Sequence, residues 1–193
     1  MIMAFRVLKN VKERILIEGL NIGANEGVYC ITARKLAKKC DISTHTIYNY
    51  FPSMRSLIDE IAITFDRKYM DEILPLINNN ASREDVFNYF LDAFIKERNS
   101  TLYYISYIHY YGFDPTSKNE RADEFLVYAK MIFGDNLDND TYLFLWDYIT
   151  RVIFYYAEKI LKGLLPDTKE FRKLAFDVVY NGVNNLINKE IKE

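Results

Sequence analysis

The sequence predicts an all-α protein. Gly and Pro number only 7 and 4 among 193 residues, too few for the many tight turns of a β-sandwich or β-barrel. Half of the residues are hydrophobic, which is enough for a substantial core. Within long segments these residues recur every three to four positions, the period of a helix with one buried face. We expect about nine helices, three in a small N-terminal head and the others in a larger body.

The first helix is expected over residues 7–25. Its apolar residues lie on one narrow arc of a helical projection, which predicts a single buried stripe: Leu8, Val11, Ile15 and Ile22. Gly27 follows and suits the left-handed end of a helix. Residues 28–31 could form a strand by composition, but no nearby segment would pair with them, so we expect a loop there.

Two short helices joined by a tight turn come next. Thr32 has the chemistry of an N-cap for the first, which has small and aliphatic residues on one side and Arg34, Lys35, Lys38 and Lys39 on the other. Residues 41–43 form the turn, and Ser43 caps the second helix, residues 44–51. Ile47 and Phe51 share its inner face. Its outer face is polar and carries Thr44, His45, Tyr48 and Asn49.

The body is predicted to continue as helices, each with a start or stop signal in the sequence. An aromatic segment at residues 101–111 could be a strand by propensity, but an isolated strand in a helical chain would lack a partner. The expected helices run from Ser53 to about residue 76, from Ser82 to 99, over 101–111, from Ser117-x-x-Glu120 to Gly134, from Asp138 or Asp140 to Gly163, and from Asp167-x-x-Glu170 to 191.

Charge is divided unevenly along the chain. Residues 1–55 hold nine Lys and Arg against four Asp and Glu, a net charge of +5. The whole chain has a net charge of −2, so residues 56–193 carry a net charge of −7. A basic head on an acidic body suggests a polyanionic partner for the head, although short segments also vary in charge by chance.

Several classes of protein are disfavoured. No apolar run is long enough to cross a bilayer, and residues 1–10 lack the apolar core of a signal peptide. Cys30 and Cys40 have no metal or redox spacing, which favours a reducing cytoplasm. The sequence shows no Gly-rich phosphate loop and only two histidines, His45 and His109. We therefore expect no enzyme activity, no metal and no cofactor.

Residues 32–57 carry the functional signal. A helix whose outer face presents short hydrogen-bonding side chains can enter the major groove of DNA, where base edges are distinguishable. The segment resembles the DNA-binding signature of the TetR (tetracycline repressor) family, with Ile42-Ser43 at the turn and Thr46-Ile47-Tyr48-Asn49-Tyr50-Phe51 in the second helix. The resemblance implies a DNA-binding domain over residues 1–53 and a ligand-binding and dimerisation domain over 54–193.

The resemblance further implies a ligand-responsive repressor that binds a palindromic operator as a homodimer. Base-reading positions would be Thr44, His45 and Asn49. Phosphate-contacting positions would be Thr46, Tyr48 and Tyr50, although the two tyrosines could instead pack against neighbouring helices. Arg34 lies where family members reach a base or a phosphate.

Two positions depart from the family pattern. Asp41 stands where the turn usually has Gly; Asp tolerates the left-handed region but adds a negative charge near DNA. Met54 stands where a phosphate-contacting Lys is usual, and Arg55 could substitute for it. A rival reading is therefore a protein of the same fold with weak DNA affinity that acts through a protein partner.

The body holds 25 of the 30 aromatic residues. A core rich in large rings explains most of them, but buried tyrosines also suit a pocket for a hydrophobic or aromatic effector. The candidate lining residues are Phe65, Tyr69, Phe90, Phe94, Tyr104, Tyr107, Trp146 and Phe154.

The last two long helices have broad apolar faces. Two such helices from each of two subunits would form a four-helix bundle about a two-fold axis, although the faces could instead pack only within one subunit. The candidate interface residues are Ile153, Tyr156, Ile160, Phe171, Leu174, Val178, Val179, Val183 and Leu186.

Overall fold

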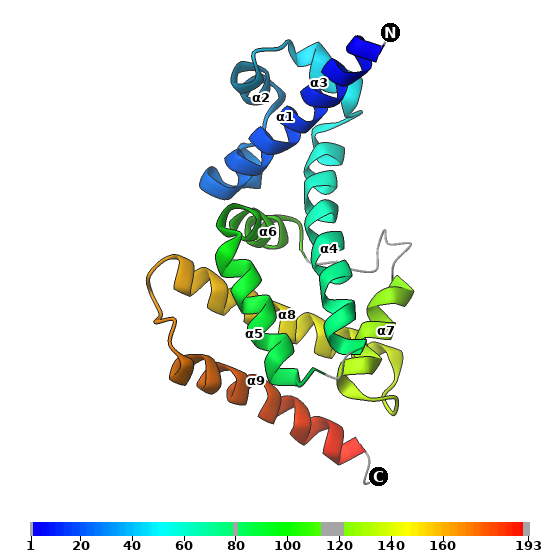
Figure 1. The fold of residues 1–193 in the computed structure, drawn as a ribbon, viewed down its shortest axis with the longest axis vertical. Coiled ribbons are helices and arrows are strands. Elements are labelled where there is room, and N and C mark those ends of the chain that lie inside the picture. Colours follow the sequence, from blue (N-terminus) through cyan, green and yellow to red (C-terminus); the bar gives the residue numbers. More distant parts are fainter. Residues whose placement is uncertain (1, 79–80, 113–121, 191–193) are drawn as a thin grey trace. The chain divides into compact units, whose positions relative to one another are not determined.

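The structure, a computed structural model, describes residues 2–78, 81–112 and 122–190 (Figure 1). Every regular element in these ranges is helical, which confirms the predicted fold class. The elements are α1 (Ile2–Glu26), the 3₁₀ turn η1 (Val28–Cys30), α2 (Ala33–Cys40), α3 (Thr44–Tyr50), α4 (Met54–Asn78), α5 (Arg83–Lys96), α6 (Arg98–Tyr111), α7 (Ala122–Phe133), α8 (Asn139–Leu161) and α9 (Lys169–Glu190).

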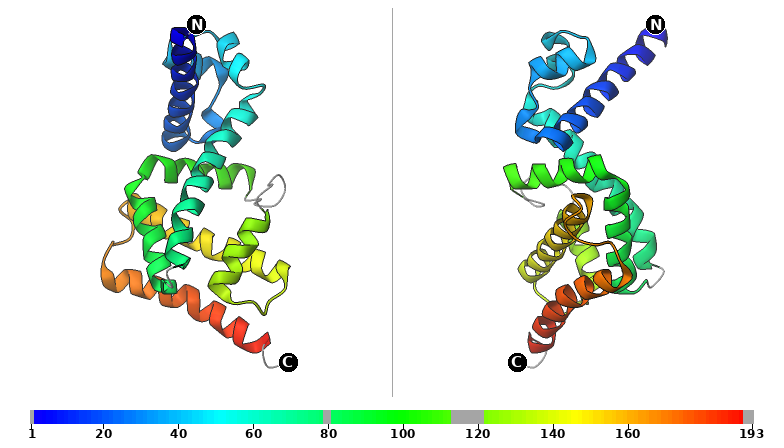
Figure 2. Two further views of the ribbon diagram at one scale, coloured as in Figure 1. Left: turned by 45° about the vertical axis from the view of Figure 1, so that its right-hand side comes forward. Right: turned by 90° about the vertical axis from the view of Figure 1, so that its left-hand side faces the viewer.

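The chain forms two compact units. The head unit comprises Met1–Lys68 and Arg98–Gly112, so α6 belongs with α1–α3 and the first part of α4 (Figure 2). The body unit comprises Tyr69–Glu97 and Phe113–Glu193. The functional boundary expected after residue 53 stays a prediction. Among the helices that the structure describes, none has a stretch long and apolar enough to span a membrane.

Each helix of the head unit contributes one or a few buried side chains to its core. Ile15 and Ile22 of α1 are buried, as their spacing predicts; the side chain of Leu8 lies outside the described residues. The segment expected to be a loop forms η1 instead, because Gly27 at φ 97° lets Cys30 N–H reach the Gly27 carbonyl. Its Val28 is buried and donates its N–H to Ser106 Oγ of α6 at 3.0 Å.

Helix α6 packs against α1 and η1 in the head unit. The close approach depends on Gly23, since a Cβ atom there would lie 2.3 Å from the Tyr103 ring. Tyr103 is fully buried and donates its hydroxyl to the Ile58 carbonyl of α4 at 2.8 Å. The segment that we expected to be helical is therefore a helix, and it fastens α1 to α4.

Two helix starts in the body unit follow the predicted caps. Ser82 forms a capping box with Asp85, and Asp138 caps α8 through the Thr141 N–H at 2.9 Å. The predicted N-cap of α9, Asp167, was wrong. The Thr168 hydroxyl caps this helix instead, because it accepts the Phe171 N–H at 3.2 Å. Ser117 and Glu120, the predicted start of α7, lie outside the described residues.

The reason for the error lies in tertiary structure. The Asp167 carboxylate pairs with the Arg172 guanidinium, which also reaches Asp92 of α5 at 2.6 Å. The Arg172 side chain holds the pKa of Asp167 below its usual value chiefly through this hydrogen bond. Both oxygens of the Asp167 carboxylate bind the Arg172 guanidinium, and the Thr168 hydroxyl accepts the backbone N–H at the start of α9 instead.

Aromatic rings fill the centre of the body unit. Phe94 of α5 stacks on Phe154 of α8 with ring centroids 4.4 Å apart, and Tyr69 meets Phe94 edge-on at 5.1 Å. Phe87 makes an edge contact with Phe176 of α9 at 5.8 Å. Such pairs add to the stability gained from burial alone. Helix α8 contacts α5, α7 and α9, and so organises this unit.

Candidate nucleic-acid interface

The turn between α2 and α3 is fixed by local hydrogen bonds. Thr32 and Ser43 accept from Lys35 and Thr46 N–H at 3.3 Å and 3.0 Å, which confirms both predicted caps. Asp41 has φ 50°, the only positive φ at a non-glycine residue in the described ranges. It therefore adopts the left-handed conformation that we expected Asp to tolerate where the family pattern has Gly.

The C-terminal end of α2 is held by α1. Arg14 donates a guanidinium hydrogen bond to the Cys40 carbonyl at 3.0 Å, and the buried Cys40 thiol lies 3.8 Å from the Arg14 carbonyl. Burial, together with the nearby Glu18 carboxylate, raises the pKa of the Cys40 thiol. The thiol therefore stays protonated and acts as a small core residue.

Burial of two side chains orients α3. Ile47 and Phe51 are buried in the head unit. The opposite face is open to solvent and presents the candidate base-reading residues Thr44, His45 and Asn49. Tyr48, also on that face, is 48% exposed, so about half of this residue remains open to solvent. The short helix is thus divided between an apolar side in the core and a polar outer surface.

The remaining α3 candidates are less accessible. Thr46 is half-buried and its hydroxyl lies 2.9 Å from the Ser43 hydroxyl, where the two share a hydrogen bond. Tyr50 is half-buried at the end of the helix. Thr46 keeps some surface beside the Ser43 cap, the end of the helix where backbone N–H groups favour a phosphate.

The basic side of α2 is only partly available. Lys35 forms an ion pair with Glu26, and Lys39 lies 3.7 Å from Glu18, both on α1. Arg34 and Lys38 are exposed. The positive charge of the head is therefore partly offset by carboxylates of the same unit, while the Arg34 side chain at the start of α2 is open to a polyanion.

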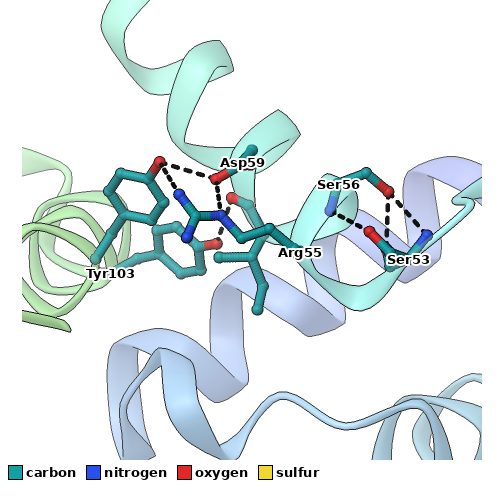
Figure 3. Close-up of polar contacts among 7 residues, drawn as sticks. Ser53, Arg55, Ser56, Asp59 and Tyr103 are labelled. Carbon is teal, nitrogen blue, oxygen red and sulfur yellow. Dashed lines mark hydrogen bonds and ion pairs between the residues drawn. The ribbon is translucent and has the colours of Figure 1, made fainter. Parts of the chain in front are cut away.

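The start of α4 follows α3 after three residues. Ser53 and Ser56 cap it reciprocally, because each backbone N–H donates to the other side chain, at 3.2 Å and 3.0 Å (Figure 3). Met54 is half-buried. Arg55 is turned to other protein groups: its Nε donates to Asp59 at 2.6 Å, and its guanidinium carbon lies 3.7 Å from the centroid of the Tyr111 ring.

The eight candidate pocket residues fall into two clusters. Phe65, Tyr104 and Tyr107 belong to the head unit, where Phe65 stacks on Tyr104 at 4.5 Å. In the body unit, Phe94 stacks on Phe154 and also contacts the rings of Tyr69 and Phe90. The five candidates in this unit are Tyr69, Phe90, Phe94, Trp146 and Phe154. All eight except Tyr107 are buried. A ligand pocket among them stays a prediction. No group of three or more potential metal ligands occurs in the described part of the chain.

The candidate interface residues differ in how exposed they are, and so in whether they could contact a second subunit. Ile153, Val179 and Val183 are buried within the chain, so they serve its own core. Three are half-buried: Tyr156, Ile160 and Phe171. Leu174 and Val178 are 57% and 58% exposed, one turn apart on α9. The side chain of Leu186 lies outside the described residues.

An exposed aromatic stripe on α8 was missed at the sequence level. Phe144, Tyr148 and Tyr155 are exposed and follow one another at helical spacings of four and seven. The spacing is visible in the sequence, but the helix is apolar on more than one side. Periodicity alone does not tell which apolar side is covered by the same chain.

The comparisons with known proteins agree with this geometry. Residues 22–61 match the family model described as bacterial regulatory proteins, tetR family, a segment that runs from the end of α1 into α4. A solved structure of a TetR family transcription regulator from Marinobacter aquaeolei VT8 has a similar fold, with a TM-score of 0.68 and 18% sequence identity over 90% of this chain and 95% of that chain. No curated protein sequence gave a match.

Proposed function

We propose that this chain, a member of the TetR family of bacterial regulatory proteins, regulates transcription by inserting α3 into the major groove of DNA. The observation that carries the proposal is the division of α3 into two faces. Ile47 and Phe51 fix the helix from inside, and a solvent-exposed polar face remains outside. A short helix held in this way is suited to base recognition.

Three residues are assigned to base contacts. Asn49 can bind the N6 and N7 atoms of adenine with its amide, and Thr44 and His45 can each donate or accept one hydrogen bond at a base edge. Arg34, exposed at the start of α2, is assigned to a base or a phosphate. Tyr48 is assigned to phosphate, together with the less accessible Thr46 and Tyr50.

We extend the proposal to a homodimer on a palindromic operator. The support is the exposed apolar surface of α8 and α9, with Phe144, Tyr148 and Tyr155 on one helix and Leu174 and Val178 on the other. Large exposed apolar residues that recur at helical spacing on one side of a helix are typical of a protein interface. A two-fold axis there would present two heads to two equivalent half-sites.

We further propose that the protein is a repressor released by a hydrophobic or aromatic small molecule. The support is the concentration of aromatic side chains around Phe94 and Phe154, since binding sites for such molecules are mostly lined by apolar and aromatic groups. A ligand that binds one conformation better than another would shift the population of DNA-binding dimers.

Fluorescence anisotropy with DNA from upstream of the protein's own gene tests the DNA-binding proposal. Binding should be tighter than to an unrelated duplex and should weaken as salt increases. Tyr48→Ala and Asn49→Ala should each weaken it by about tenfold, the effect of removing one good contact. Asn136→Ala, at an exposed position between α7 and α8, is the matched control and should bind as the wild type does.

One alternative has specific observations in its favour: a protein of this fold that binds DNA weakly and acts through a protein partner. Asp41 adds a carboxylate beside α3, and Lys35, Lys39 and Arg55 are engaged by carboxylates of the head. Elution from heparin distinguishes the two functions. A DNA-binding head should be retained to moderate salt, whereas the alternative predicts elution near the start of the gradient.

A further inference from the structure

We propose that Arg55 is a positioning residue, which fastens the first turn of α4 to the C-terminal end of α6 and so fixes α3 for DNA binding, rather than contacting a phosphate itself. We call this set of residues the Arg55 clamp; it consists of Arg55, Asp59, Tyr107 and Tyr111. The inference rests on the proposed function, because it concerns how the head binds DNA.

The guanidinium group of Arg55 is engaged on several sides. Its Nε donates to Asp59 Oδ1 at 2.6 Å, and its Nη2 lies 3.5 Å from the Tyr107 hydroxyl. The Tyr111 ring covers one face of the cation, with 3.7 Å from the guanidinium carbon to the ring centroid. Figure 3 shows Arg55 and Asp59 together on one side of α4. A planar cation that stacks and hydrogen-bonds at once is held in one orientation.

The electrostatics of the clamp also keep the cation in place. Tyr107 and Tyr111 belong to the last turns of α6, and the C-terminal end of a helix favours a positive charge. Tyr107 donates its hydroxyl to the same Asp59 oxygen at 2.9 Å. Burial and this carboxylate raise the pKa of Tyr107 to about 12, so its hydroxyl stays protonated at neutral pH.

The clamp lies close to the recognition helix along the chain. Only residues 51–53 separate α3 from α4, and Phe51 within them is buried. Leu57, two residues beyond Arg55, is fully buried. The Ile58 carbonyl accepts a hydrogen bond from the Tyr103 hydroxyl of α6. The first turns of α4 are thus attached to α6 at two places, the Arg55 clamp and the Tyr103 hydrogen bond to Ile58. Loosening the clamp would let the end of α3 move.

The experiment compares the salt dependence of DNA binding among clamp variants. The probe is a duplex that the wild-type protein selects from a random-sequence pool. Arg55→Met and Tyr111→Leu should each weaken binding about threefold to tenfold, the range of one stacked cation with its hydrogen bond. The slope of log Kd against log salt should not change, because the phosphate-binding groups all remain.

Three further proteins sharpen the comparison. The double variant Arg55→Met with Tyr111→Leu should be no weaker than either single variant, because both remove one interaction. Arg55→Lys keeps the charge but cannot stack as a planar fork, so it should behave like Arg55→Met. Arg67→Met removes an exposed arginine farther along α4 and should leave both the affinity and the slope unchanged.

A direct bond from Arg55 to a phosphate gives a different pattern and would overturn the inference. Arg55→Met would then lower the slope by about 0.9 for each phosphate that is no longer neutralised, Arg55→Lys would retain most of the affinity, and Tyr111→Leu would bind as the wild type does. Tighter binding by Tyr111→Leu would equally contradict the assigned role.

Hydrogen exchange without DNA separates this inference from the proposed function. If the wild type binds no duplex, the proposed function fails, but the clamp still predicts faster amide exchange at residues 44–60 in Arg55→Met and Tyr111→Leu, with exchange in α8 unchanged. Unchanged exchange at residues 44–60 would show that Arg55 positions nothing.

Discussion

Replacement of Gly23 by Ala tests whether α6 is part of the head. Gly23 lies where α1 passes the Tyr103 ring, and an added Cβ atom would fall 2.3 Å and 2.6 Å from two atoms of that ring. Tyr103 is fully buried and hydrogen-bonded to the Ile58 carbonyl, so its ring has little room to move.

The magnitude follows from opposing contributions. Ala is favoured over Gly in a helix interior by about 1 kcal/mol. Overpacking a rigid neighbour costs about 1–3 kcal/mol, and displacing the Tyr103 hydroxyl from its acceptor costs about 1 kcal/mol more. We expect a net destabilisation of about 1–3 kcal/mol, which for a chain of this size lowers Tm by roughly 2–10 °C.

Chemical denaturation followed by circular dichroism measures the effect. Gly19→Ala is the matched comparison, because its Cβ would meet only the ends of two aliphatic side chains, Ile61 Cδ1 at 2.8 Å and Leu57 Cδ2 at 3.3 Å, rather than a rigid ring. That variant should change stability by less than about 1 kcal/mol. Combining Gly23→Ala with Tyr103→Leu should cost less than the sum of the two single changes. If Gly23→Ala alone stabilised the protein, the packing of α6 on α1 would be refuted.

Three further predictions concern the turn, the body surface and pH. Asp41→Asn keeps a residue that tolerates φ 50° and removes a charge, so it should tighten DNA binding roughly twofold to fivefold in an anisotropy titration; unchanged affinity would place Asp41 away from the phosphates. Leu174→Asp should convert a dimer to monomers in sedimentation velocity, whereas Leu164→Asp, at an exposed loop residue, should not; a dimer that survives the change at Leu174 would exclude that face. Hydrogen bonds from Thr141 lower the pKa of Asp138, so this cap stabilises α8 above the unfolded pKa and is lost as pH falls through the lower folded value. Asp138→Asn should therefore flatten the pH dependence of Tm below about pH 4, and an unaltered dependence would contradict that cap.

Local chemistry made much of the fold predictable. Thr32, Ser43, Ser82 and Asp138 cap helices as their side chains and positions indicate, because a cap depends on atoms only two or three residues away. The polar face of α3 was predictable for the same reason, since Ile47 fixes which side of a short helix turns inward.

Contacts between distant segments could not be predicted in this way. The Asp167 carboxylate binds Arg172, which also bridges to α5, and it does not cap α9. The orientation of Arg55 depends on rings about fifty residues further along the chain. Nothing in the residues around either position signals these partners, and propensities give way to such tertiary contacts.

The same limit applies to the apolar faces of the body. Val179 and Val178 are adjacent and equally hydrophobic, yet the first is buried within the chain and the second is 58% exposed. Hydrophobic periodicity identifies a helix that has apolar sides but does not assign each side to a core or to an interface. The surfaces available for a second subunit became visible only once the helices were packed.

Selection of DNA sequences from a random pool tests the central claim, that the outer face of α3 reads bases, most directly. The wild-type protein should enrich a sequence with two related half-sites, and Asn49→Ala should relax the preference at one position of each half-site while the other positions persist. Arg55→Met should weaken binding without altering the preferred sequence. If the wild type enriches no sequence, or if Asn49→Ala leaves every preference intact, the assignment of base recognition to α3 is contradicted.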